Sequence, residues 1–255
     1  MRRFEGRTVV VTGGGGAIGG ATCRRFAAEG GRVAVLDLDG EAAERVAAAI
    51  RAAGGEARGL RCDITDRATV DAVVAAVESG LGPIDVLVNN AGWDVFRTFA
   101  QTTPAEWDKL IAINLVGPLH MHHAILPGMV ARRRGRIVNV ASDAARVGSS
   151  GESVYAACKG GLVAFSKTIA REHAHHGITV NVVCPGPTDT PLFDGVRQGA
   201  GNPEKLLESF RRAIPLGRIA QPDDLPGAIA FFASDDAGYV TGQVLSVSGG
   251  LTMSG

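Results

Sequence analysis

Residues 12–20, TGGGGAIGG, join an apolar run, TVVV, to the helix-forming segment ATCRRFAAEGG. Four consecutive glycines lose much backbone entropy on folding, which is unfavourable. We therefore expect them to have a structural or binding role in this loop. Between a strand and a helix, glycines let the backbone approach a dinucleotide pyrophosphate, which the helix N-terminus attracts. Gly14-x-Gly16-x-x-Gly19 has the dinucleotide-binding spacing. The alternative is a flexible strand-to-helix turn.

Asp37 ends the next predicted strand, eighteen residues after Gly19. A carboxylate there can accept hydrogen bonds from both hydroxyls of the adenosine ribose. This carboxylate would repel the 2′-phosphate of NADP. The next two residues are Leu38 and Asp39, and neither is a basic residue that could bind that phosphate. The sequence therefore favours NAD over NADP. The alternative is that Asp37 only ends a strand in a turn.

Short β-branched runs alternate with alanine-rich helical segments along the whole chain. Most runs are apolar throughout, which is typical of strands covered by helices on both faces. This βαβα alternation predicts an α/β fold, a Rossmann-type doubly wound parallel sheet, in a single domain over residues 1–255. We expect a substrate lid within the Gly- and Pro-rich residues 187–215. The predicted strands are residues 8–12, 32–37, 57–62, 84–89, 135–142, 178–185 and 243–248, and the clearest helices are 41–54, 67–80, 104–134 and 153–176.

The charge balance and the cysteines narrow the class of protein. The 26 basic and 26 acidic residues give a formal net charge of zero, which supplies no case for nucleic acid as a partner. The four cysteines lack CxxC spacing, so neither a disulfide framework nor a metal site is expected. No stretch approaches the roughly 20 apolar residues of a membrane span, and the N-terminal apolar run is too short for a signal peptide. We expect a cytoplasmic protein without a membrane partner.

Tyr155 and Lys159 have the i, i+4 spacing that places two side chains on one face of a helix. A cation beside a phenol favours the phenolate, although burial and the charge of a cofactor are needed as well. Such pairs also occur on plain helix surfaces. Ser142 ends a predicted strand at the carboxyl edge where doubly wound sheets bind ligands. Asn89-Asn90-Ala91-Gly92 ends another strand at that edge, and Asn114 lies in the helix between the two.

These motifs together resemble the classical short-chain dehydrogenases/reductases over essentially the whole chain. The resemblance implies the strand order 3-2-1-4-5-6-7 and a homotetramer built on the helices 104–134 and 153–176. It implies that Tyr155 is the general base or acid and that Ser142 binds the substrate oxygen. Lys159 would hold the nicotinamide ribose and lower the pKa of Tyr155, and Asn114 would hold a water that links Lys159 to solvent.

The resemblance also implies the cofactor contacts, with Asp63 at the adenine and Pro185 at the nicotinamide end. In the frame of the family, Ala17 replaces the middle glycine of the loop. We expect its methyl group to be tolerated because position 17 has an ordinary negative φ at the start of a helix. The implied cofactor-binding residues are Gly13, Gly16, Ala17, Ile18, Gly19, Asp37, Leu38, Asp63, Ile64, Asn90, Ala91, Gly92, Tyr155, Lys159, Pro185, Gly186, Thr188 and Thr190.

Longer stretches, including NNAGWD and ASDAARVGSSGESVYAACKGGLVAFSKT, resemble family members that oxidise cyclic β-hydroxyacyl-CoA thioesters. That likeness implies the substrate 2-hydroxycyclohexane-1-carbonyl-CoA, from the degradation of alicyclic or aromatic acids. The alternatives are a 3-oxoacyl thioester reductase, a dehydrogenase of free cyclic or aryl secondary alcohols, and a non-catalytic dinucleotide sensor. The last should lack Tyr155 or Lys159, and this chain retains both. The implied substrate-binding residues are Trp93, Ser142, Asp143, Arg146, Tyr155 and Leu192.

Several other residues carry two interpretations. His120, His122 and His123 do not share one helix face, so a helix surface or a subunit contact is expected rather than a metal site. Cys158 is expected to pack in the core rather than to react. Trp93 and Arg146 have structural alternatives, in packing and in capping a loop. The lid cations Arg197, Lys205, Arg211 and Arg212 either attract the phosphates of CoA or form the solvated face of an amphipathic helix.

Overall fold

The computed structural model describes residues 2–194 and 202–254, which form a seven-stranded sheet in the order β3-β2-β1-β4-β5-β6-β7. Every pair of neighbouring strands is parallel. The predicted α/β class and strand order are confirmed. The strands are β1 (Thr8–Thr12), β2 (Arg32–Asp37), β3 (Glu56–Arg61), β4 (Ile84–Asn89), β5 (Gly135–Val140), β6 (Ile178–Pro185) and β7 (Val244–Val247).

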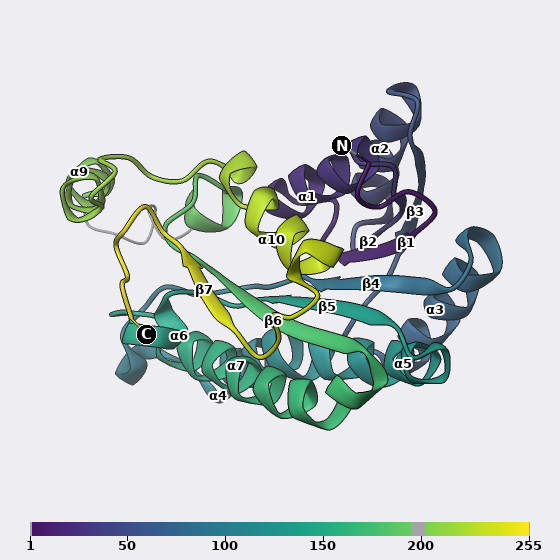
Figure 1. Cartoon of the computed structure of the whole chain (residues 1–255). Coiled ribbons are helices and arrows are strands. Elements are labelled where there is room, and N and C mark those ends of the chain that lie inside the picture. The colour runs from purple at the N-terminus through teal and green to yellow at the C-terminus, as the bar shows by residue number, and fades with distance from the viewer. Residues whose placement is uncertain (1, 195–201, 255) are drawn as a thin grey trace.

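Helices cover both faces of the sheet (Figure 1). On one face lie α1 (Ala17–Ala28), α2 (Gly40–Ala52) and α10 (Pro226–Ala233), and on the other lie α3 (Arg67–Leu81), α5 (Gly117–Arg132) and α7 (Ser153–His173). The shorter elements are η1 (Phe99–Gln101), α4 (Pro104–Ile111), η2 (Ala112–Val116), α6 (Ala144–Val147), η3 (Ala174–His176), α9 (Pro203–Ala213), η4 (Pro222–Asp224) and η5 (Asp235–Ala237).

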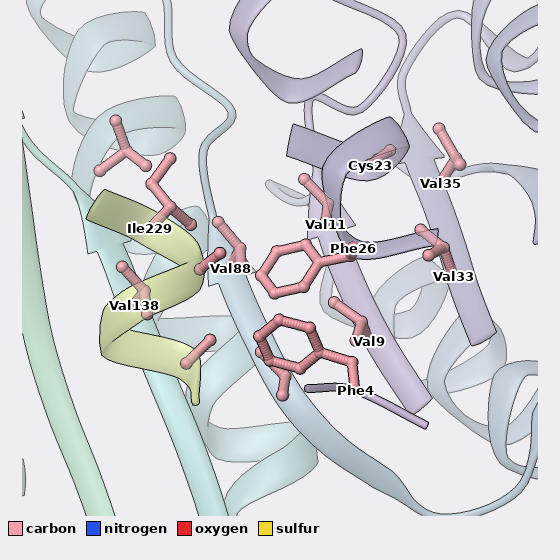
Figure 2. Packing of buried hydrophobic residues seen from close by; sticks show 14 of the residues in the cluster. Phe4, Val9, Val11, Cys23, Phe26, Val33, Val35, Val88, Val138 and Ile229 are labelled. Atoms are coloured by element: carbon pink, nitrogen blue, oxygen red, sulfur yellow. The ribbon is translucent and has the colours of Figure 1, made fainter. Parts of the chain in front are cut away.

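The side chains on one face of β1 and β2 show why this packing forms. Val9 and Val11 alternate with Val10 along β1, so the two valines face one helical layer and Val10 faces the other. Figure 2 shows Val9 and Val11 against Phe26 of α1, with Phe4 below Phe26, and Ile229 of α10 on the far side of Val88 in the same cluster. All of these side chains are fully buried. Burial of each contributes about 1.5–3 kcal/mol, which ties the N-terminal segment and α10 to the same sheet.

The predicted helix 104–134 differs from the observed one in its middle. Thr103 and Glu106 form the capping box that begins α4, as their spacing indicates. Residues Ala112–Val116 then form a π-helical turn before α5 continues. The segment Pro104–Arg132 is long and apolar enough to cross a membrane by length and composition, contrary to the expectation that no stretch approaches a membrane span. In the fold, its buried residues Met121, Ile125 and Met129 pack on the sheet as a core helix does.

Candidate active site

The glycine loop between β1 and α1 leaves the N-terminus of α1 open to a ligand. Gly13 has a φ of +63°, a conformation that favours glycine, and its carbonyl accepts the N–H of Gly16. Gly16 is the N-cap of α1 and provides no side-chain cap, so the first N–H groups of the helix have no side-chain acceptor. Ala17 is the first residue of α1 and does not have a positive φ. This supports the expectation that residue 17 has an ordinary negative φ at the start of the helix.

A cavity of about 650 Å³ extends from this loop along the carboxyl ends of the strands. Its apolar walls and the open helix N-terminus fit a dinucleotide. Cys62, Thr65 and Lys109 also line it, although the sequence analysis did not single them out. The predicted cofactor residues that line it are Gly13, Gly16, Ala17, Ile18, Gly19, Asp37, Leu38, Asp63, Ile64, Asn90, Ala91, Gly92 and Thr190.

Asp37 lies at the end of β2, where its carboxylate is held by backbone donors. Oδ2 accepts a 3.0 Å hydrogen bond from the N–H of Gly15, and Oδ1 accepts one of 3.0 Å from Asp39. These two bonds fix the side chain at the rim of the cavity. The remaining lone pairs of both oxygens can accept hydrogen bonds from a ribose diol.

A second cavity, of about 580 Å³, adjoins the first and contains Ser142, Tyr155 and Lys159. Residues Ile18, Asn90, Gly92, Thr190 and Leu192 line both cavities. The remaining predicted cofactor residues, Pro185, Gly186 and Thr188, lie in the second cavity, where a nicotinamide end would enter it. The sequence placed Ser142 at the end of a strand, whereas β5 ends at Val140 and Ser142 follows in the loop.

Tyr155 and Lys159 project from the first turns of α7, one helical turn apart. The Lys159 Nζ lies 5.7 Å from the centroid of the Tyr155 ring and donates a 3.0 Å hydrogen bond to the carbonyl of Val140. Burial lowers the pKa of Lys159 to about 8. Hydrogen bonding by Ser142, which lines the same cavity, lowers the pKa of the Tyr155 phenol and so favours the phenolate. The three side chains therefore converge on one point of the cavity.

Burial acts on Tyr155 in the direction opposite to the expectation that it helps to form the phenolate. In the chain by itself, the pKa of Tyr155 lies well above its ordinary value. The main cause is burial, and the carboxyl groups of Asp94 and Glu152 add to it. The hydrogen bond from Ser142 is the opposing effect. Ionisation of the phenol thus requires positive charge beyond that of the protein.

Asn114 is fully buried in the π-helical turn and fixes the loop after β4. Its Nδ2 donates to the carbonyls of Trp93 (2.7 Å) and Leu110 (3.0 Å), and its Oδ1 accepts the N–H of Trp93 (3.3 Å). A Cβ added to Gly92 would lie 3.1 Å from Asn114 Oδ1 and 3.4 Å from Lys159 Nζ. Asn114 therefore lies close to Lys159, behind the cavity wall.

Two predicted substrate residues do not lie where the resemblance implies. Arg146 lines neither cavity, because its guanidinium donates to Ser246 Oγ (2.9 Å) and to the carbonyl of Ser254. Trp93 lines the cofactor-side cavity, with Lys109 Nζ 3.9 Å from its ring centroid. Arg146 is thus held at the C-terminal segment, whereas Trp93 packs against the cluster that contains Leu110 and Tyr155. Asp143 and Leu192 do line the second cavity.

The structure brings in residues that sequence reasoning missed. Asp94 and Glu152 line the second cavity with Phe96, Phe193 and Phe210. Asp94 directly follows Trp93, and Glu152 precedes Tyr155 by three positions, the spacing of neighbours on a helix face. That spacing was a usable signal for Glu152. The loop position of Asp94 offered none.

The remaining candidates are accounted for by packing. His120 and His123 hydrogen-bond to the carbonyl of Ile64 and to Arg67, respectively. His122 is not on the helix surface that was expected but is buried, because β4 and β5 supply polar partners in the core. Cys158 is buried, and burial raises the pKa of its thiol, as the packing interpretation predicts.

The lid cations are only partly described. Arg197 lies outside the described residues, while Lys205, Arg211 and Arg212 are exposed on α9. α9 turns Leu206 and Phe210 toward the second cavity, and Arg212 pairs with Glu208 at 3.0 Å. Figure 1 shows α9 beyond one end of the sheet, on the side of α6 and the C-terminus. The exposed cations form the solvated face of an amphipathic helix.

Comparisons with known proteins agree with this geometry. A family model described as enoyl-(acyl carrier protein) reductase matches residues 15–252. The 3-oxoacyl-[acyl-carrier-protein] reductase FabG of Thermotoga maritima is 37% identical and covers 98% of this chain and 100% of its own. The BbsD subunit of (2S)-[(R)-hydroxy(phenyl)methyl]succinyl-CoA dehydrogenase from Thauera aromatica is 36% identical, over 98% of each chain. The crystal structure of levodione reductase superposes with a TM-score of 0.93, at 35% identity, over 97% of this chain and 98% of the other.

Proposed function

Because the chain belongs to the classical short-chain dehydrogenase/reductase family, and so acts as an oxidoreductase on hydroxyl or keto groups, we propose a specific reaction for it. The chain oxidises 2-hydroxycyclohexane-1-carbonyl-CoA to 2-ketocyclohexane-1-carbonyl-CoA with NAD, in the degradation of alicyclic or aromatic acids. The observation that carries this proposal is the convergence of Ser142, Tyr155 and Lys159 on one cavity beside the dinucleotide-sized one.

NAD, when bound, supplies the hydride acceptor and a positive charge at the nicotinamide. The open N-terminus of α1 would receive the pyrophosphate, and Asp37 would accept hydrogen bonds from the ribose hydroxyls. The negative charge of Asp37, at the rim of the cofactor cavity, supports NAD over NADP. Asp63 and Ile64, which line the same cavity, would contact the adenine.

Tyr155 would remove the hydroxyl proton of the substrate as general base, and return it in the reverse direction. Ser142, which lines the same cavity, would hold the same oxygen through its hydroxyl. Lys159 places its ammonium beside the phenol and supplies charge that favours the phenolate. Asn114 positions the loop after β4 and, as the family resemblance implies, would hold a water for proton relay.

The shape of the second cavity supports a cyclic apolar substrate. Phe96, Leu192, Phe193, Leu206 and Phe210 supply apolar wall around the catalytic oxygen position. The BbsD relative acts on a hydroxyacyl-CoA whose hydroxyl carbon bears a phenyl ring, as its name states. A cavity of about 580 Å³ can enclose a six-membered ring, while the much larger CoA moiety must extend outside it.

Initial rates with a substrate panel test the proposal. The panel contains the CoA thioester, the free hydroxy acid and cyclohexanol, each with NAD and with NADP. We expect the highest kcat/KM for the CoA thioester with NAD. A preference for the free alcohol would contradict the CoA part of the proposal, and a preference for NADP would contradict the cofactor part.

A second candidate, a 3-oxoacyl thioester reductase, is favoured by the FabG relatives from Thermotoga maritima and Escherichia coli. It predicts faster reduction of linear acetoacetyl-CoA than of the cyclic β-keto thioester. Dehydrogenation of a free cyclic or aryl alcohol is the remaining enzymatic alternative. A non-catalytic dinucleotide sensor would show no turnover with any member of the panel, despite the retained Ser142, Tyr155 and Lys159.

We further propose a cytoplasmic homotetramer. All four cysteines are free and buried, which suits a reducing compartment. The tetramer rests on the family resemblance, with contacts through α4, α5 and α7. Phe99 of η1 (57% exposed) stacks on Trp107 of α4, and Ile111 of α4 is 39% exposed, so apolar surface is available at α4. Light scattering of the purified protein measures the number of subunits, and a monomer would contradict the assignment.

A further inference from the structure

Three carboxyl groups from separate segments line the cavity that contains Tyr155. Asp94 comes from the loop after β4, Asp143 from the loop after β5, and Glu152 from the N-terminus of α7. Among the lining residues that the structure describes, Lys159 is the single cation, and its ammonium already bonds to the Val140 carbonyl. The wall around the reacting oxygen therefore carries more negative than positive groups.

Asp94 and Glu152 form a pair. Burial and the neighbouring carboxyl group of Glu152 raise the pKa of Asp94 to about 8. Both carboxyl groups also raise the pKa of Tyr155, and all three side chains line the same cavity. Asp94 and Glu152 therefore place acidic groups on a cavity wall that they share with the phenol.

Asp143 contributes a third carboxyl group to this cavity, separate from the Asp94 and Glu152 pair. The residue is only 6% exposed, and Oδ1 accepts from the Ser246 hydroxyl. Asp143 lines the same cavity, and its Oδ2 is buried without a hydrogen-bond partner, 3.7 Å from the position of a Cβ built on Gly186. A carboxylate oxygen can only accept hydrogen bonds. A ligand that meets it must be neutral or present an N–H or O–H group.

We propose that Asp94, Asp143 and Glu152 form a charge filter, which admits the hydroxy acid when its carboxyl group is masked as a neutral thioester and rejects the free acid. The proposal rests on the proposed function and gives a reason for the thioester besides the binding of CoA itself. A second carboxylate in a poorly hydrated cavity is repelled by the fixed ones and loses its own water. An ester carbonyl at the same place suffers neither effect.

A pair of inhibitors of equal shape tests the filter in the unmodified protein. Cyclohexanecarboxamide is neutral and cyclohexanecarboxylate is charged at pH 7. Each is measured as a competitive inhibitor of NAD-dependent oxidation of cyclohexanol, or of the thioester where cyclohexanol is not turned over. We expect the carboxylate to bind at least about tenfold more weakly. Equal inhibition constants, or a tighter carboxylate, would overturn the proposal.

Removal of the fixed charge should open the cavity to the free acid. A single variant such as E152Q can leave one ionised carboxylate, so the test is the double variant D94N/E152Q. The substrates are the free hydroxy acid and its N-acetylcysteamine thioester, which is neutral and lacks the nucleotide of CoA. We expect kcat/KM for the free acid to rise at least about tenfold over the unmodified protein. The exposed pair D108N/E172Q removes the same formal charge outside the cavity and should leave the free-acid rate unchanged.

These outcomes are separable from those of the proposed function. If the CoA thioester is a poor substrate but the carboxamide still binds better than the carboxylate, the proposed substrate is wrong and the filter stands. If the CoA thioester is preferred but the free acid gains nothing in D94N/E152Q and the two inhibitors bind equally, the filter is wrong. A gain of activity toward the free acid cannot arise from partial unfolding of the variant.

Discussion

The carbonyl oxygen of Gly13 occupies the space that a side chain at Gly19 would need. A Cβ added to Gly19 would overlap that oxygen and would lie 2.7 Å from Nδ2 of Asn90. Asn90 in turn donates to the carbonyls of Thr12 (3.1 Å) and Gly13 (3.2 Å). The end of β1, the first turn of α1 and the loop after β4 are therefore locked together at one point, beside the cofactor cavity.

We expect Gly19→Ala to lower the free energy of unfolding by about 3 kcal/mol, because backbone atoms must shift to make room. The matched control is Gly16→Ala, where the added Cβ would meet only the Gly13 oxygen, at 3.4 Å. The control should lose less than about 1 kcal/mol. Urea denaturation of the two variants measures both values, and equal losses would contradict this account of Gly19.

Ala17 tests how closely the loop approaches the cofactor. The residue lines the cavity at the first position of α1. We expect Ala17→Val to weaken NAD binding at least about tenfold, because its methyl groups would fill space needed by the pyrophosphate. Ala17→Gly should bind about as well as the unmodified protein. Titration calorimetry compares the variants, and an unchanged affinity in Ala17→Val would refute the hypothesis.

The fold was predictable because apolar runs and helix caps are local signals. The β1 run 8–12 and the capping box at Thr103 appear where expected, and parallel order follows from their alternation with helices. The π-helical turn at residues 112–116 was not predictable, since its sequence, AINLV, continues the helical pattern. The roles of the glycines were only partly predictable, because spacing does not show that a side chain at Gly19 would overlap the Gly13 carbonyl while one at Gly16 would have room.

The site was predictable to the extent that its residues follow strand ends. Ser142, Tyr155 and Lys159 converge as their positions imply, whereas Arg146 turns toward the C-terminal segment. Side-chain direction in an irregular loop depends on backbone angles that no spacing encodes. The meeting of Asp94 with Glu152 depends on two loops that are distant in the sequence, so only the fold shows it.

Asp37 should determine the choice of cofactor. We expect Asp37→Asn to raise the ratio of kcat/KM for NADP to that for NAD at least about tenfold, because the repulsion of a 2′-phosphate is removed. Asp39→Asn removes the same charge two residues away, at the N-cap of α2, and should leave the ratio nearly unchanged. Initial rates with both cofactors provide the comparison. An identical ratio in the Asp37 variant would show that another group discriminates.

Tyr155→Phe removes the proton-transferring group while keeping the ring. We expect kcat to fall about 100- to 10,000-fold, the usual contribution of general acid–base catalysis. Binding of NAD, followed by fluorescence, should change less than about threefold because the phenol only borders the cofactor. The chain has one other tyrosine, Tyr239, which is fully exposed, and Tyr239→Phe is the control. Normal turnover in the Tyr155 variant would exclude it as the base.

His122 should make the fold sensitive to acid. Its Nδ1–H donates to the Pro118 carbonyl (2.8 Å), and Nε2 lies 3.4 Å from the Asn139 amide nitrogen, which donates to it. Protonation of Nε2 would set its N–H against the N–H of the Asn139 amide, so two donors would face each other. Burial also disfavours the charged imidazolium and lowers the pKa of His122 to about 4. Between pH 6.5 and 4 the unfolded chain therefore binds a proton that the folded chain does not. Stability should fall by about 1.4 kcal/mol per pH unit in this range from this group alone.

His122→Gln should flatten that part of the pH profile, even though it lowers stability at pH 7 by disturbing the buried polar cluster. The neighbouring His123→Gln is the matched control, since His123 is exposed and its Nδ1 lies 2.7 Å from Arg67. Chemical denaturation at pH 7, 6, 5 and 4.5 gives the slopes of the three proteins. In the cluster of His122 with Asn89 and Asn139, only the imidazole can gain a proton in this pH range. If the free energy of unfolding of His122→Gln fell with pH as steeply as that of the unmodified protein, the acid-sensitive group would lie elsewhere.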